Sequence, residues 1–349
     1  MTTKLITRNS LKKLMRDLLT VFEIVAPVQG EAVSAFQRIS AYEEIGWPDS
    51  NTARSPKEFF LPPADGLFRF QQTGRETLLS EPANHHGPRI ILGVRPCDAA
   101  ALAIMDRVFS EKGIDVHYTA LRDNTLVIGQ PCWKPGKDCF CTSVGINPTA
   151  SLNMDIMLTD LRDERFLVDI VSPKGEDFFS YFSHFFQEPE DLPRALSAQT
   201  REMVFYLGED KMFDLRVIKK WLDNNFENPL WTKTAARCIG CGACSFLCPT
   251  CHCFDFTDES TYQDNSFQGL RKRVWDSCSF SHFTQTPTHQ PRPTQDRRFR
   301  QRIMHKFKYS FDRYQQLACV GCGRCRSLCP VGIDLVEVLV SISRQSHQF

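Results

Sequence analysis

The chain has 349 residues, of which 42% are hydrophobic and 24% are charged, and its formal net charge is +1. This composition excludes a disordered chain, and no apolar run approaches the roughly 18 residues of a membrane span. The near-neutral charge gives no general reason to expect nucleic acid as a partner. Because the first residues lack the apolar core of a signal peptide, we expect a cytoplasmic protein with no direct membrane insertion.

The first part, residues 1–230, is expected to form a mixed α/β domain. Apolar residues at helical spacing predict an amphipathic helix over residues 4–22. A helix capped by Asp98 stands between two apolar runs, and this order predicts a βαβ unit with parallel strands. The strands are predicted at residues 22–28, 67–70, 89–94, 125–129, 154–158 and 166–170.

Two segments of this domain share the order strand, Gly, Pro, Cys, and end at Cys97 and Cys132. If the strands are parallel neighbours, both thiols lie at the carboxyl edge of the sheet, where α/β proteins bind ligands. Cys139 and Cys141 follow closely. We therefore consider Cys97, Cys132, Cys139 and Cys141 as a hypothetical third metal site, against the alternative of small buried hydrophobic residues. The helix N-terminus at Cys97 predicts a lowered thiol pKa.

The second part, residues 231–349, follows a predicted helix at 215–226 and contains most of the 15 cysteines. None precedes Cys97, and eleven lie between Cys238 and Cys329. In a reducing compartment, such clustered thiols are expected to be metal ligands rather than disulfides. A Pro-, Thr-, Gln- and Arg-rich loop at 284–300 joins two similar cysteine blocks. A capping-box spacing of Asp334 and Glu337 announces a final helix.

Both cysteine blocks have the pattern C-x2-C-x2-C-x3-C-P, which is typical of [4Fe–4S] clusters. The alternative is structural zinc, which favours paired C-x2-C knuckles instead. In two-cluster proteins the fourth cysteine of each block binds the other block's cluster. We therefore assign the first cluster to Cys238, Cys241, Cys244 and Cys329, and the second to Cys319, Cys322, Cys325 and Cys248. The predicted class is α+β, a mixed α/β domain followed by a mainly helical, ferredoxin-like dicluster domain.

Charged residues near the two blocks bear on the redox chemistry. Arg237, Arg324 and Arg326 lie within or beside the loops, and nearby cations favour the reduced, more negative cluster. A basic stretch from Arg297 to Lys308 has an apolar face at Met304, Phe307, Phe311 and Tyr314, which indicates a core helix with a solvated or partner-facing basic side.

Cys251, Cys253 and Cys278 have no place in either predicted cluster. They could line the first cluster, act as redox-active thiols or complete a site with His252, or they could be packed, inert thiols. The match of Cys248-Pro-Thr-Cys251-His252 to the haem-attachment pattern C-x-x-C-H is ascribed to chance, because Cys248 is already assigned. His85 and His86 are interpreted as part of a surface loop.

Four short segments and the two cluster motifs together resemble a known family. They are Gly93-Val-Arg-Pro-Cys97-Asp98, Asp138-Cys-Phe-Cys141, Cys248-Pro-Thr-Cys-His-Cys253, Trp275-Asp-Ser-Cys278 and the two cluster motifs. From about residue 50 onward the chain is similar to the iron–sulfur beta subunits of NAD(P)-linked nickel–iron hydrogenases (sulfhydrogenases) and to the A subunit of anaerobic sulfite reductase.

The resemblance implies an electron-transfer subunit with no catalytic residue of its own. It would relay electrons between a flavin-containing subunit that acts on NAD(P)H and a catalytic subunit of hydrogenase or sulfite reductase type. Two alternatives remain open: a redox sensor that binds nucleic acid through the Arg297–Lys308 stretch, and a thiol–disulfide protein that uses Cys251, Cys253 and Cys278. Asp98 is interpreted as a helix cap rather than a proton-transfer group.

Overall fold

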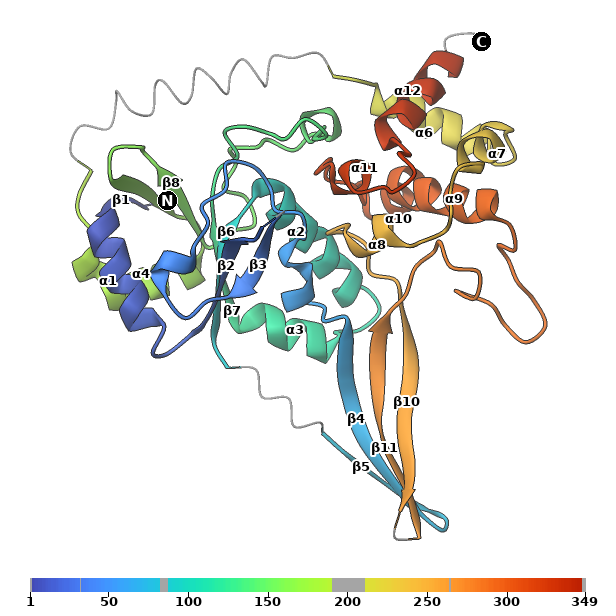
Figure 1. Ribbon diagram of the computed structural model, residues 1–349, viewed down its shortest axis with the longest axis horizontal. Helices are drawn as coiled ribbons and strands as arrows, with labels where there is room; N and C mark the ends of the chain where they lie inside the picture. Colours follow the sequence, from blue (N-terminus) through green and yellow to red (C-terminus); the bar gives the residue numbers. More distant parts are fainter. Residues whose placement is uncertain (1, 32, 82–86, 190–210, 264, 347–349) are drawn as a thin grey trace.

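The computed structural model describes residues 2–31, 33–81, 87–189, 211–263 and 265–346, so His85 and His86 lie outside the described residues. Figure 1 shows three parts: an α/β body that contains the N-terminus, a helical body that contains the C-terminal helix, and a long β arm that projects from between them. None of the helices in these described ranges is long and apolar enough to cross a membrane.

A seven-stranded mixed sheet forms the centre of the α/β body. Strands β2, β6, β7 and β8 are parallel neighbours, whereas β1, β9 and β3 pair antiparallel with theirs. The predicted βαβ unit is confirmed, because α2 (Pro96–Ser110) connects the neighbouring parallel strands β6 and β7. In spatial order the strands are β1 (Thr2–Thr7), β9 (Arg165–Ile170), β8 (Ile156–Asp160), β7 (Thr125–Gly129), β6 (Arg89–Val94), β2 (Glu23–Gln29) and β3 (Ser34–Arg38).

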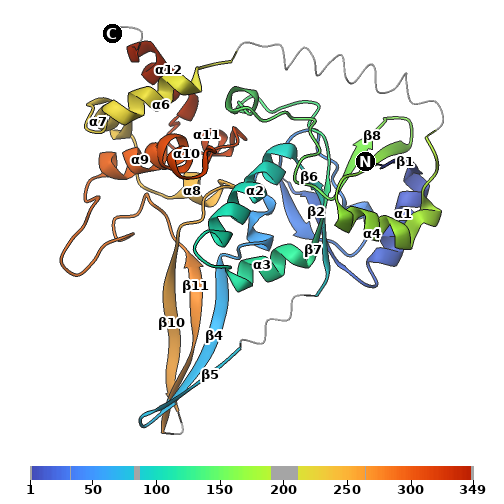
Figure 2. The same ribbon diagram turned by 180° about the vertical axis from the view of Figure 1, so that it is seen from behind.

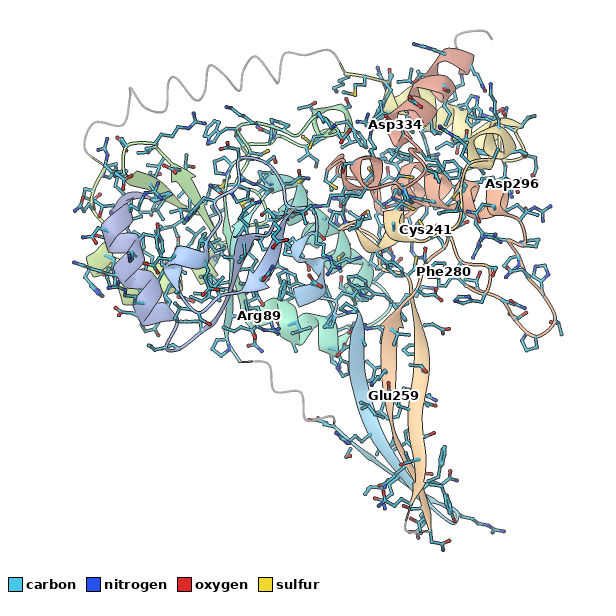
Figure 3. All side chains as sticks on the ribbon, viewed as in Figure 1. Arg89, Cys241, Glu259, Phe280, Asp296 and Asp334 are labelled. Carbon is cyan, nitrogen blue, oxygen red and sulfur yellow. The ribbon has the colours of Figure 1, made fainter. Side chains whose placement is uncertain are left out.

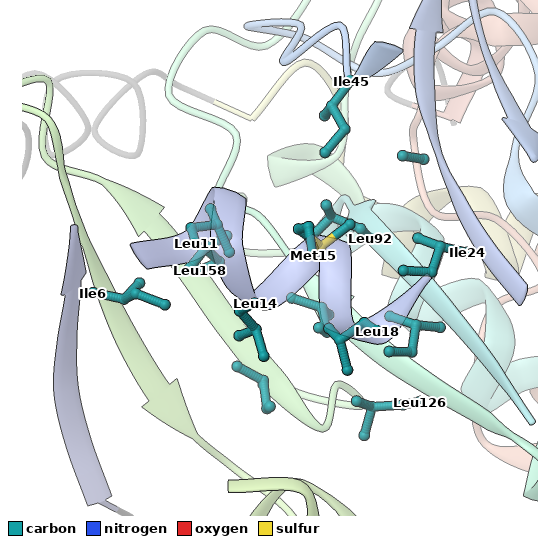
Figure 4. Packing of buried hydrophobic residues seen from close by; sticks show 14 of the residues in the cluster. Ile6, Leu11, Leu14, Met15, Leu18, Ile24, Ile45, Leu92, Leu126 and Leu158 are labelled. Atoms are coloured by element: carbon teal, nitrogen blue, oxygen red, sulfur yellow. The ribbon is translucent and has the colours of Figure 1, made fainter. Parts of the chain in front are cut away.

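Helices cover both faces of this sheet, because alternate strand residues point to opposite sides. On one face, Leu14 and Leu18 of α1 (Arg8–Leu18) pack with residues such as Leu92, as Figure 4 shows, and α4 (Pro173–Phe182) joins the same core. On the other face, Ile91 packs with residues of α2 and α3 (Val116–Asp123). The result is a three-layer α/β/α body.

The N-terminus corrects one prediction, since residues 4–22 are not a single helix. Thr2–Thr7 form strand β1, paired along its length with β9. Helix α1 then begins after Thr7, whose hydroxyl accepts a hydrogen bond from the Ser10 amide at 3.1 Å. The β-branched residues at the start of the chain favour a strand, and Thr7 is a good N-cap residue. The helical spacing of apolar residues therefore applies only after Thr7.

Asp98 also differs from its prediction. The N-cap position of α2 is Arg95, which makes no side-chain cap hydrogen bond. The carboxylate of Asp98 instead accepts two hydrogen bonds from Arg324, at 2.5 and 2.8 Å. Both side chains are at most 2% exposed. This buried, bidentate ion pair joins α2 to the second cysteine loop, in the helical body.

The arm is a four-stranded antiparallel sheet that projects far from both bodies (Figures 1 and 2). At its base the buried Arg273 pairs with Asp65 at 3.0 Å and with Asp115 at 2.5 Å. The sequence predicts only one short strand of the arm, at residues 67–70. Nearly all residues of strand β10 (Phe254–Gln263) are exposed, so this strand has no buried face whose apolar pattern would reveal it. The strand order is β10 (Phe254–Gln263), β11 (Ser266–Trp275), β4 (Ala64–Thr73) and β5 (Glu76–Ser80). The arm thus takes strands from both sides of residue 230, and the division of domains at that residue stays a prediction.

The helical body packs around a second core that includes Trp231, Phe307 and Leu339. The predicted helix at 215–226 ends two residues early, at Asn224, and the final six residues of the predicted 284–300 loop belong to α9. A five-residue π-helical turn, His305–Tyr309, continues α9. The helices are α6 (Leu215–Asn224), α7 (Leu230–Ala235), α8 (Ala243–Phe246), α9 (Gln295–Met304), α10 (Ser310–Tyr314), α11 (Arg324–Ser327) and α12 (Leu335–Ser346); short 3-10 turns elsewhere span Tyr42–Glu44, Pro56–Phe59, Thr142–Val144 and Ser183–Phe185.

The ion pair between α2 and α11 leads to the first prediction. Asp98→Ala should destabilise the protein by about 3–5 kcal/mol, because it leaves the Arg324 guanidinium buried without its anion. The measurement is the midpoint of thermal unfolding by circular dichroism, recorded anaerobically. Asp258→Ala, which breaks the exposed Asp258–Arg271 pair of the arm, is the control and should leave the midpoint unchanged. Equal midpoints for the two variants would contradict this role of Asp98.

Candidate metal centre

The two cysteine motifs fold into similar loops, each leading into a one-turn helix. Gly242 precedes α8 and Gly323 precedes α11, each with a φ of 75° that favours glycine. A Cβ at Gly323 would lie 2.6 Å from the carbonyl oxygen of Asp138, and one at Gly321 would lie 2.6 Å from the Cys141 amide nitrogen. Glycine in the second loop therefore allows close contact with the segment that carries Cys139 and Cys141.

Cysteines from both loops line one cavity. Cys238, Cys241 and Cys244 come from the first motif, and Cys329 comes from the second; these are the four residues assigned to the first cluster. Cys325, assigned to the second cluster, also lines this cavity. Figure 3 labels Cys241, the exposed member of the set, near α8 and above the base of the arm.

The donors to these sulfurs are neutral. Gln295 donates from Nε2 to the Cys238 sulfur at 3.0 Å, and the Ile333 amide donates to the Cys329 sulfur at 3.3 Å. The cavity thus combines thiols from two loops that are far apart in the sequence with uncharged hydrogen-bond donors, and the Arg302 side chain also lines it.

The second predicted set also gathers in one place. Burial raises the pKa of Cys319 to about 11, and the nearby Cys248 and Cys325 thiols add to the rise while Lys306 opposes it. Burial likewise raises the pKa of Cys322, with Cys248 and Cys325 again among its charged neighbours. Cys248 of the first motif therefore lies beside the three thiols of the second motif.

Cationic side chains face Cys248 and Cys251 from inside the protein. The Lys306 ammonium donates to the Cys248 sulfur at 3.1 Å, and the Arg302 guanidinium donates to the Cys251 sulfur at 3.5 Å. Lys57 donates to the Cys251 carbonyl at 3.0 Å and lies 3.9 Å from the ring centre of Trp275. All three cations are buried.

These contacts correct the interpretation of the basic stretch. Arg300, Arg302 and Lys306 are buried, so the basic side of this helix is not a solvated stripe. Burial alone would lower the pKa of Lys306, but the Cys248 and Cys251 thiolates raise it above its usual value. Arg302 and Lys306 are the site residues that sequence reasoning missed. The sequence does contain a sign of their burial. Arg302 and Lys306 are four residues apart, and each directly precedes an apolar core residue, Ile303 or Phe307.

The three arginines expected to act on the clusters are placed differently. Arg324 pairs with Asp98, and Arg326 pairs with Asp334 at 2.5 Å, so carboxylates offset both charges. Arg237 is exposed.

The charge balance of this region fits an anionic group. Across the described ranges, Lys57, Arg302 and Lys306 form no ion pair with a carboxylate, and Arg302 Nη2 has no hydrogen-bond partner. A buried cation without an anion is costly. A cubane bound by four thiolates is an anion, so the residues present fit such a group. Within the residues described, no three His, Cys, Asp or Glu side chains are arranged to hold a single metal ion, whereas a cubane spreads its ligands over four irons.

Three cysteines of the hypothetical third site, Cys97, Cys139 and Cys141, lie against the second cysteine loop. Cys97 and Cys132 follow the carboxyl ends of the neighbouring strands β6 and β7. The Cys139 sulfur lies 3.6 Å from the Cys322 carbonyl oxygen. Burial raises the pKa of Cys141 to about 12, and the Cys139 and Cys132 thiols add to the rise.

The expected low pKa of Cys97 is wrong. Burial raises the pKa of this thiol, and the adjacent Asp98 adds to the rise, so these effects outweigh that of the helix N-terminus. Arg95, a buried cation, lies near Cys97 and Cys132.

Each of the three unassigned cysteines, Cys251, Cys253 and Cys278, contacts another thiol. A hydrogen bond from Cys253 lowers the pKa of Cys278 to about 6, although burial opposes it. Cys251 contacts Cys248. The His252 ring packs with His305, their centres 5.5 Å apart, and burial lowers the pKa of His252.

Comparison with known proteins agrees with this arrangement. Residues 237–333 match the family model described as a 4Fe-4S dicluster domain. Over 325 residues the chain is 31% identical to the sulfhydrogenase 2 subunit beta of Pyrococcus furiosus, a match that spans 91% of this chain and 92% of that protein. The C-terminal part is therefore a 4Fe–4S dicluster domain, and the chain belongs to the family of sulfhydrogenase beta subunits.

Proposed function

We propose that this chain is an electron-transfer subunit of a multi-subunit oxidoreductase and binds two [4Fe–4S] clusters through exchanged cysteines. The observation that carries the proposal is the cavity in which Cys329 joins Cys238, Cys241 and Cys244. The partner set is Cys319, Cys322, Cys325 and Cys248. Each motif supplies three ligands to its own cluster and one to the other, so the two loops are tied together.

The protein around these cysteines suits a carrier of negative charge. When bound, the clusters supply one-electron carriers whose formal site charge of about −2 becomes about −3 on reduction. Arg302 and Lys306 offset this charge from the buried side, and Gln295 and the Ile333 amide donate to the thiolates of the first set. The two loops contact each other, so the two sites are close enough for electron exchange.

The geometry also supports a third cluster site beside the second cysteine loop. Cys139 and Cys141 border Cys322 and Gly321 of the second loop, and the Phe140 amide donates to the Gly321 carbonyl at 2.8 Å. Cys97 packs in one cluster with Cys322, and Cys132 is a charged neighbour of Cys139 and Cys141. We propose that these four cysteines bind a further [4Fe–4S] cluster. Electrons would then pass between the helical body and the α/β body through the second loop.

The name of the relative describes a beta subunit, so it has other subunits as partners. For this chain we propose a cytoplasmic complex with two kinds of partner: a flavin subunit that acts on NAD(P)H, and a catalytic metalloenzyme subunit of hydrogenase or sulfite reductase type. In this scheme the chain performs no substrate chemistry. The sensor alternative loses its main support, because the buried Arg300, Arg302 and Lys306 cannot present a nucleic-acid surface.

The exchange of cysteines predicts which variants behave alike. Cys329→Ser and Cys238→Ser should abolish the same electron paramagnetic resonance (EPR) signal of the dithionite-reduced protein, although the residues belong to different motifs. Cys325→Ser should abolish the other signal. The control, Cys253→Ser, should retain both. If Cys329→Ser instead behaved like Cys325→Ser, each motif would bind its cluster alone.

The proposed third site predicts the iron content. Anaerobically purified protein should contain about twelve irons and twelve acid-labile sulfides per chain, and Cys132→Ser should lower each to about eight. The two signals assigned to the dicluster motifs should remain in that variant. About eight irons in the unmodified protein would return Cys97, Cys132, Cys139 and Cys141 to a structural role, and stoichiometric zinc without iron would refute the proposed function.

A further inference from the structure

We infer that Lys306 sets the order of reduction potentials in the cluster pair, so that the Cys248, Cys319, Cys322 and Cys325 site has the higher potential. This site would be the electron-accepting end of the pair. The inference rests on the proposed function and adds to it a direction of electron transfer.

The ammonium group of Lys306 is held firmly against this site. The side chain is 3% exposed, and Nζ donates to the Cys248 sulfur at 3.1 Å, to the Thr250 hydroxyl at 3.0 Å and to the Ala318 carbonyl at 2.9 Å. The Thr250 hydroxyl also contacts the Cys248 sulfur, at 3.1 Å. All three donor positions of the ammonium are thus directed at groups next to Cys248 and Cys319.

A backbone hydrogen bond also holds Lys306 in this position. Lys306 lies in the π-helical turn His305–Tyr309, and its carbonyl accepts a hydrogen bond from the Ala318 amide at 3.0 Å. Lys306 and Ala318 are therefore joined through both backbone and side chain. Ala318 directly precedes Cys319, so the cation is anchored to the loop whose cluster it faces.

The charge of Lys306 is not offset by protein carboxylates. In the described part of the chain, Lys306 has no acidic partner, unlike Arg324 and Arg326, which pair with Asp98 and Asp334. A compensated arginine contributes little net potential at the site. Lys306 thus supplies a net positive charge in direct contact with a ligand sulfur.

The other cysteine set lacks an equivalent cation of its own. Its sulfurs receive hydrogen bonds from the amide group of Gln295 and the backbone of Ile333, which are neutral. Arg302 lines the cavity of this set, and Cys244 and Cys325, one from each set, are both among its charged neighbours. Its hydrogen bond to a sulfur goes to Cys251, which belongs to neither set. Lys306 donates directly to a ligand sulfur of the second set. Lys57, a further buried cation, has Cys248 among its charged neighbours and so adds positive charge on the same side.

A nearby cation stabilises the reduced cluster, which carries one more negative charge, and so raises its potential. Burial acts in the opposite direction, and Cys248, Cys319 and Cys322 are more buried than the first set. The same burial excludes the water that would otherwise screen Lys306, and its ammonium contacts a ligand sulfur directly. We therefore expect the effect of the cation to exceed that of burial.

The test is an EPR-monitored redox titration of the full-length, anaerobically purified protein. Lys306→Gln should lower the higher midpoint potential by about 59 mV or more, a tenfold change in the electron-transfer equilibrium, and leave the lower one nearly unchanged. Lys306→Arg keeps the positive charge and should lower the higher midpoint potential much less. The matched control is Lys308→Gln on the same turn, because Lys308 pairs with Asp223 and Asp312. It should change neither midpoint.

A second measurement tests the order without altering Lys306. Cys238→Ser should retain the high-potential signal, and Cys248→Ser should retain the low-potential one; the reverse assignment would overturn the inference even if Lys306→Gln failed to fold. Unchanged midpoints in a Lys306→Gln protein with full iron content would also overturn it, as would an equal shift in Lys306→Arg, which would indicate a structural effect. Those results would leave the proposed function intact, whereas unmodified protein without iron would refute both.

Discussion

The interaction on which the site depends is that of buried cations with clustered thiols. Cys248, Cys251 and the second cysteine loop gather negative charge in a buried region. Arg302 and Lys306 face it, and among the residues that the structure describes no carboxylate pairs with either cation. Neither partner is stable alone in such an environment. The helix that carries the cations and the loops that carry the thiols must therefore assemble together.

The same constraint explains how the parts of the chain are joined. The second cysteine loop contacts the Cys139–Cys141 segment through Gly321 and Gly323, and its Arg324 pairs with Asp98 of the α/β body. Arg273 closes the base of the arm against Asp65 and Asp115. Each joint is buried and polar, so it fixes relative position more strictly than apolar contact alone. A precise arrangement of redox centres requires such fixed positions.

Membership in the sulfhydrogenase beta family and the 4Fe–4S dicluster domain agree with the proposed role in electron transfer. In the proposed arrangement the second cysteine loop contacts both the first cysteine loop and the segment that carries Cys139 and Cys141. The four-stranded β arm projects away from the α/β body and the helical body (Figures 1 and 2). The proposed asymmetry at Lys306 would give this succession a direction, since an electron favours the site with the uncompensated cation.

The sequence by itself determined the features that depend on local spacing. Cysteines at fixed intervals identify the two cluster loops, and an apolar strand before and after α2 predicts the parallel pair β6 and β7, because these patterns are set within a few residues. Tertiary structure alone decided the rest. Asp98 meets Arg324, 226 positions away, and Lys306 meets Cys248, 58 positions away, although both looked like ordinary cap or surface residues. Burial and ion pairing here join segments that are far apart in the sequence, so a local sequence pattern cannot predict them.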